Sequence, residues 1–71
     1  MSDLKKCFGL RVKKLREEKG MTQEQLADHI DVTVETICHI ERGIHGPRFD
    51  TLEKIADVLG FPVKVLFDFK D

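Results

Sequence analysis

One stretch decides the fold: TQEQLADHIDVTVETICHIER, which runs from Thr22 to Arg42. Its first half is typical of a short helix, because Thr22 stands where an N-cap belongs and Gln25 completes a capping box. Thr33 then caps a second helix, whose apolar positions recur until Gly43, a residue type common just past a helix end. The stretch therefore predicts two short helices joined by a tight turn, with Arg42 at the end of the second.

Helical spacing of apolar residues continues on both sides of this stretch. Asp50 and Glu53 form a second expected capping box, and Pro62 suits the first position of a last helix. No segment alternates with a period of two, so we expect no sheet. The sequence predicts an all-α fold, with residues 1–71 as one domain of five helices around one core. These helices are expected at about 4–19, 23–30, 34–42, 51–59 and 62–67.

Composition supports a globular domain, since 41% of the 71 residues are hydrophobic and 35% are charged. The longest uncharged run is far too short to span a membrane and no secretory segment opens the chain, so we expect a cytoplasmic protein. Cys7 and Cys38 do not make a disulfide framework. Cys38 and the three histidines lack the paired spacing of a zinc site, so we expect no metal and no cofactor.

Charge is unevenly distributed along the chain, although the net charge is only −1. Residues 1–20 carry a net charge of +4 and residues 42–49 a net charge of +2, whereas residues 21–41 carry −5. Positive charge thus flanks the central stretch on both sides. This pattern fits a phosphate-binding clamp around a polar recognition element, and it equally fits an ordinary solvated surface.

Four segments in a fixed order carry a family resemblance: FGLRVKKLR (8–16), GMTQEQLA (20–27), TICHIERG (36–43) and PRFDTLEKIADVLG (47–60). Together they resemble the helix-turn-helix family of phage Cro and repressor proteins, also called the xenobiotic-response-element family. The resemblance covers Phe8 to Phe67 without a gap. It implies a five-helix lambda-repressor-like domain that binds double-stranded DNA, with the helix-turn-helix at about residues 22–42.

The resemblance also implies roles for individual residues. Arg16 and Glu41 correspond to a charged pair that ties the first helix to the third. The positions that correspond to phosphate contacts are Thr22, Gln23, Thr33, Arg42, His45 and Arg48. The positions that correspond to base contacts are Val34, Glu35, Thr36, Cys38 and His39.

The chain departs from the family where bases would be read. The family commonly has Arg, Gln or Ser at the positions of Val34 and His39, and this chain does not. Val34 could contact a thymine methyl group, Glu35 could accept a hydrogen bond from cytosine, and His39 could donate one to a purine. Asp31 replaces the glycine usual in the turn, and Pro62 replaces a capping Ser or Thr. We therefore expect more reliance on phosphate contacts and DNA shape.

Two functions from different classes remain open. The first is a transcriptional regulator, such as a repressor, that binds a short two-fold operator as a homodimer through Val65 and Phe69, apolar residues surplus to the core. The alternative is a protein-interaction module of the same fold with little DNA affinity, which the acidic central stretch favours. An enzyme is not expected, because the chain has no nucleophile–base pair, glycine-rich phosphate loop or metal set.

Overall fold

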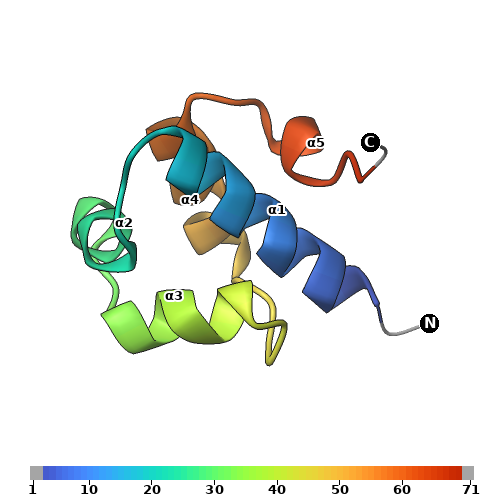
Figure 1. Cartoon of the computed structure of the whole chain (residues 1–71), viewed down its shortest axis with the longest axis horizontal. Helices are drawn as coiled ribbons and strands as arrows, with labels where there is room; N and C mark the ends of the chain where they lie inside the picture. Colours follow the sequence, from blue (N-terminus) through green and yellow to red (C-terminus); the bar gives the residue numbers. More distant parts are fainter. Residues whose placement is uncertain (1–2, 70–71) are drawn as a thin grey trace.

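The computed structural model describes residues 3–69, and within that range it contains helices and no strand. The elements are α1 (Leu4–Glu18), α2 (Gln23–Ile30), α3 (Val34–Glu41), α4 (Phe49–Leu59) and α5 (Val63–Leu66). In Figure 1, α1 runs in front of α4, while α2 and α3 lie beside and below them and α5 lies above the first half of α1. The all-α prediction with five helices is confirmed.

The ends of α2 and α3 follow the predicted capping chemistry. The Thr22 hydroxyl accepts a hydrogen bond from the Gln25 backbone at 3.0 Å, and the Gln25 side chain accepts one from the Thr22 backbone at 2.9 Å. The Thr33 hydroxyl accepts from the Thr36 backbone at 3.2 Å. Asp31 ends α2 in the left-handed conformation, with φ 61°, which glycine normally supplies at this place.

Two expectations for the later helices are wrong. Asp50 and Glu53 do not form a capping box, because α4 begins at Phe49 and Asp50 is already inside the helix. The Asp50 carboxylate accepts instead from the Thr51 backbone at 2.9 Å. Pro62 is the N-cap of α5 and not its first helical residue. The first helical residue of α4 lies two residues before the position that a cap at Asp50 implies, and that of α5 lies one residue after the expected Pro62.

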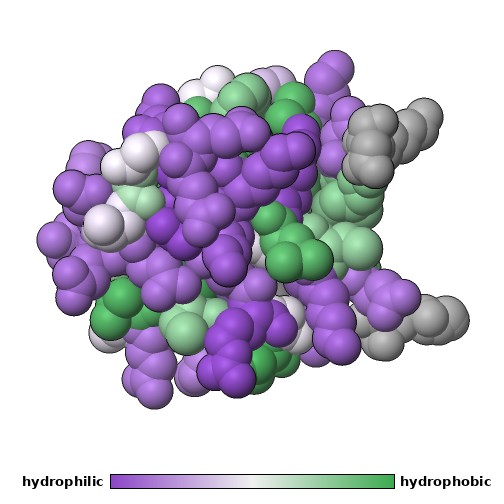
Figure 2. Space-filling model, in the orientation of Figure 1, coloured by the Kyte–Doolittle hydropathy of each residue, from purple (hydrophilic) through white to green (hydrophobic). Residues whose placement is uncertain are grey.

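One core unites the five helices. Ala27, the small residue of the helix-turn-helix, is buried where α2 meets its neighbours. In the view of Figure 2, hydrophilic residues cover most of the surface and apolar residues show as separate patches. The buried apolar residues are Phe8, Val12, Leu15, Leu26, Ala27, Ile30, Ile37, Ile40, Ile55, Ala56, Leu59 and Leu66.

Gly9 sets the distance between α1 and the end of α3. A Cβ atom at this position would overlap the Ile40 carbonyl oxygen and would lie 2.7 Å from that of Glu41. One turn earlier, Lys6 packs against Gly43, where an added Cβ atom would lie 2.9 Å from the Lys6 Cα. The first half of α1 therefore lies directly against the C-terminal end of α3.

Candidate nucleic-acid interface

α3 has one face in the core and the opposite face in solvent. Ile37, Ile40 and Glu41 are buried on the inner face. At 3.6 residues per turn, the opposite side belongs to Glu35, His39 and Arg42. Glu35 and Arg42 are exposed and His39 is half-buried. This outward row is the part of α3 that a ligand can reach most directly.

The other three expected base-contacting residues lie on the flanks of this row. Val34 begins the helix and has 41% of its surface exposed. Cys38 is half-buried. Thr36 is also half-buried and its hydroxyl lies 2.9 Å from that of Thr33, beside a hollow that extends to the start of α4. The exposure of these five side chains thus differs from one position to the next.

The glutamate on the inner face of α3 is held by a two-pronged ion pair. Arg16 Nε donates to Glu41 Oε2 at 2.7 Å, and Arg16 Nη2 donates to Glu41 Oε1 at 3.0 Å. Both residues are buried, with 7% and 5% of their surface exposed. The hydrogen bond that Arg16 donates to Glu41 raises the pKa of Arg16, burial acts in the opposite direction, and the charges of Glu41 and Glu17 also raise it. The pair connects α1 to the end of α3.

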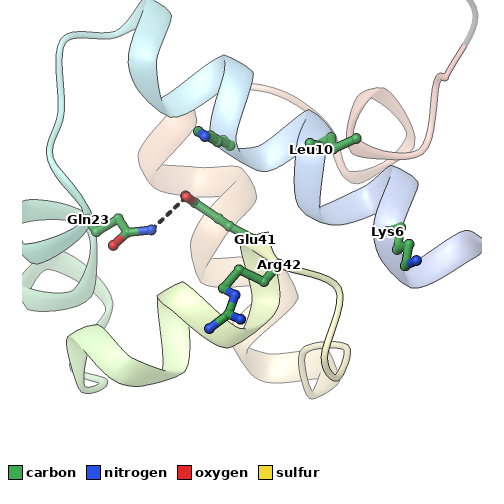
Figure 3. Close-up of a pocket in the computed structure, with 6 residues that line it drawn as sticks. Lys6, Leu10, Gln23, Glu41 and Arg42 are labelled. Carbon is green, nitrogen blue, oxygen red and sulfur yellow. Dashed lines mark hydrogen bonds between the residues drawn. The ribbon is translucent and has the colours of Figure 1, made fainter.

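The start of α2 joins the same network. Gln23 Nε2 donates to Glu41 Oε1 at 2.9 Å (Figure 3). Together with the bonds from Arg16, this bond connects Glu41 to both α1 and α2. Sequence reasoning missed this bond. Its only signal is that Glu41 lies four residues after Ile37, on the apolar side of α3.

Thr22 and Gln23 lie at the N-terminus of α2, where free backbone N–H groups and the helix dipole favour an anion. Thr22 is exposed, whereas Gln23 is half-buried by its bond to Glu41. Thr33 is exposed and uses its hydroxyl to cap α3. These residues lie at the starts of the two helices of the motif.

The basic candidates lie beyond the end of α3. Arg42 directly follows that helix and is exposed. The His45 ring lies edge-on to the His39 ring, with 5.2 Å between the centroids. Arg48 is exposed and lies 3.8 Å from Asp50, Nε to Oδ1. The structure therefore brings His45 to the outward row of α3.

The two residues expected at a dimer contact lie near the C-terminus. Val65 is half-buried, and its carbonyl oxygen accepts a hydrogen bond from Arg11 Nε at 3.2 Å. Phe69 has 38% of its surface exposed and its ring lies 6.2 Å from that of Phe67. Sequence reasoning overlooked Phe49, which at 87% exposure is far more open than either.

Comparison with known proteins assigns this chain to a family. The model of the family described as Helix-turn-helix matches residues 12–66. The chain is 40% identical over 68 residues to the control protein C.MunI of a Mycoplasma species, covering 94% of this chain and 92% of that protein. It is 39% identical over 61 residues to an uncharacterised HTH-type transcriptional regulator of Archaeoglobus fulgidus, covering 86% and 87%.

A phage repressor and a solved structure support the same family assignment. The chain is 34% identical over 59 residues to the cryptic phage CTXphi transcriptional repressor RstR of Vibrio cholerae, covering 83% of this chain but only 53% of the repressor. Among solved structures, the restriction-modification controller protein C.AhdI of Aeromonas hydrophila superposes with a TM-score of 0.85 at 33% identity, covering 94% of this chain and all of that one. This chain therefore belongs to the helix-turn-helix family of transcriptional regulators, whose members include phage repressors and control proteins.

Proposed function

We propose that this protein regulates transcription by binding a short two-fold operator in double-stranded DNA as a homodimer. The observation that carries the proposal is that α3 is held on its inner face and open to solvent on its outer face. Its inner face is fastened to α1 and α2 through Glu41, and its outward row of Glu35, His39 and Arg42 is left for a ligand. A helix of this size fits the major groove, which is about 12 Å wide.

Base contacts are assigned to the exposed side of α3 and its flanks. Glu35 would accept a hydrogen bond from a cytosine amino group, and His39 would donate one to a purine. Val34 would contact a thymine methyl group. Thr36 and Cys38, which are half-buried on the flanks, complete the set with shorter reach.

Phosphate contacts are assigned to both sides of that row. Thr22 and Gln23 offer the N-terminus of α2 on one side. Beyond the end of α3, Arg42, His45 and Arg48 offer cationic or hydrogen-bonding side chains, and Thr33 adds a hydroxyl at its start. Such contacts fix the position of the protein on the duplex, and they do not read sequence.

We place the protein in the cytoplasm, where its two free cysteines would stay reduced. In the described part of the chain, no helix is long and apolar enough to cross a membrane. We assign it no catalytic role, since its relatives are named as regulators.

A second candidate is an interaction module of the same fold with little affinity for DNA. Residues 21–41, which include both helices of the motif, carry five acidic and no basic side chains. That charge repels phosphate and would suit a basic protein surface. Under the proposed function, the positive charges of Arg42, Arg48 and α1 must outweigh the repulsion between this acidic stretch and the phosphates.

Selection of bound sequences from random duplex DNA at low salt tests the proposal. We expect enrichment of a palindrome whose half-sites lie one helical turn apart, about 34 Å. A variant with Arg42 and Arg48 both changed to alanine is the control: both side chains are exposed, so we expect it to keep the fold and to lose two of the proposed phosphate contacts. Absence of enrichment with the parent protein at low salt would remove the regulator and leave the interaction module.

A further inference from the structure

A hollow of about 380 Å³ lies between α1, the start of α2 and the end of α3. Three of its six lining side chains are cations, two from α1 and one from the residue that follows α3, and one is the amide of Gln23. Figure 3 shows Leu10 and Lys6 on α1, and Glu41 and Arg42 on the facing end of α3. The lining residues are Lys6, Leu10, Lys13, Gln23, Glu41 and Arg42.

A backbone contact brings together two of the segments that carry these cations. Lys6 packs directly against Gly43, the residue after Arg42, so the two positive charges come from adjoining backbone. Lys6, Leu10 and Lys13 are spaced by four and three residues, so they form one row along α1. This row lines the hollow, whereas Lys5 and Lys14, which are also exposed on α1, do not.

The one acidic side chain in the hollow does not oppose an anion. Both oxygens of Glu41 already accept hydrogen bonds, from two nitrogens of Arg16 and from Gln23 Nε2. Its charge is balanced by the buried guanidinium of Arg16. Within residues 3–69, Lys6, Lys13 and Arg42 take part in none of the ion pairs, so their positive charge remains around the opening.

We propose that this hollow binds a phosphate group, with Lys6 and Lys13 of α1 as ligands beside Arg42 and Gln23. Two sources share this chemistry: a phosphodiester of a DNA backbone, and a free phosphate or phosphorylated small molecule. The DNA source rests on the proposed function, and it extends the contact surface from the helix-turn-helix onto α1. Gln23 and Arg42 connect the hollow to the helix-turn-helix surface, because both residues line the hollow and are also among the proposed phosphate contacts.

Two double variants with the same change in charge test the DNA source. Lys6→Gln with Lys13→Gln removes the lining cations, and Lys5→Gln with Lys14→Gln removes two exposed lysines of α1 outside the hollow. If the hollow holds one backbone phosphate, the first pair reduces the magnitude of the negative slope of log Kobs against log salt by about one unit. The control pair leaves that slope unchanged. Circular dichroism checks that both variants keep the helical fold.

A titration with inorganic phosphate, without DNA, tests the free source. Phosphate that shifts the amide resonances of residues 6–13 and Gln23 in the parent and in the control pair, but not in the Lys6–Lys13 pair, supports a site for a free anion. That result stands even if the parent binds no duplex, in which case the proposed function fails and this site does not. Equal salt slopes for the two pairs, together with no selective phosphate shift, would overturn the proposal and leave the proposed function intact.

Discussion

Arg16 and Glu41 are 25 residues apart in the chain and face each other in a parallel, two-bond geometry, Nε to Oε2 at 2.7 Å and Nη2 to Oε1 at 3.0 Å. Arg16 Nη1 also donates to the Met21 carbonyl at 2.7 Å, which fixes the loop before α2. With the bond from Gln23, this network holds three helices at one point. It therefore sets the angle at which α3 is presented.

Removing one member of this pair should be costly, because it leaves the other as a buried charge. We expect Glu41→Ala or Arg16→Ala to lower the free energy of unfolding by about 3–5 kcal/mol. Lys14→Ala, on the exposed side of α1, should change it by less than about 0.5 kcal/mol. Urea unfolding measures all three. Equal stabilities for these variants would show that the pair does not support the fold.

The pH dependence of stability follows from the direction of the Arg16 pKa. Glu41 raises that pKa above its ordinary value, so the contribution of Arg16 is fully present below the unfolded-state pKa. It is lost only as pH rises through the still higher folded-state pKa. We expect the stability difference between the parent and Arg16→Ala to stay constant from neutral to mildly alkaline pH, measured by urea unfolding. A difference that shrinks across neutral pH would contradict this.

Gly9→Ala should destabilise the protein, although alanine is the better helix former. The added methyl group would overlap carbonyl oxygens at the end of α3, which can move only if the helices separate. We expect a loss of about 1–3 kcal/mol in thermal or urea unfolding. Gly46→Ala is the control, since nothing lies within 4 Å of its added Cβ atom. If the two changes have the same effect, the close approach of α1 and α3 is not a constraint.

Asp31→Gly should stabilise the protein. A left-handed conformation costs a non-glycine residue about 1–2 kcal/mol, and the larger unfolded-state freedom of glycine offsets part of that relief. A net gain of about 0.5–1 kcal/mol in urea unfolding is expected. Asp28→Gly, an exposed position inside α2, should instead lose about 0.3–0.5 kcal/mol, the difference in helix propensity between the two residues. A loss at both positions would mean that Asp31 makes a favourable contact in the turn.

Arg42 and Glu35 should respond differently if the protein reads DNA as proposed. Arg42→Ala should weaken binding to all duplexes alike and lower the salt slope by about one unit. Glu35→Ala should relax the preference at one base pair by about 1–3 kcal/mol. Binding assays with the selected duplex and its single-base variants measure both. A uniform loss for both changes would refute the division between phosphate and base contacts.

Assembly should depend on Phe69 more than on Phe49. Phe69 is close to the aromatic row of Phe8 and Phe67, whose rings lie 5.0 Å apart, so a partner there would extend an existing apolar cluster. We expect Phe69→Glu to produce monomers in sedimentation experiments and Phe49→Glu to leave the dimer intact. The opposite outcome would place the interface at the start of α4.

Most of the fold could be predicted because its signals are local. The Thr22 capping box, the Thr33 cap and the left-handed Asp31 each depend on a few neighbouring residues. The capping box expected at Asp50 is wrong because a cap also depends on which residue begins the helix. A shift of two residues in the start of α4 moves the carboxylate from the cap into the first turn, and apolar periodicity does not fix a helix start so closely.

The candidate site could be predicted only in outline. The spacing on α3 places Glu35 and His39 on one face, but it does not show that Gln23 is bound to Glu41 or that His45 lies against His39. Those contacts depend on how helices cross. The close contact of Gly9 with the end of α3, and the position of Lys6 and Lys13 beside Arg42, also depend on how the helices cross. Both join segments that are more than 25 residues apart in the chain.

The contacts that hold α3 in place also affect the entropy of DNA binding. Its first turn is closed by Thr33 and its last turn is fastened by Glu41, so the helix is preorganised before a ligand arrives. Ordering a flexible segment on binding consumes conformational entropy and adds a large negative change in heat capacity. A duplex that meets this helix orders little new backbone. In calorimetry, its binding entropy should therefore come mainly from counterions and water released from the duplex, and should fall as salt is raised.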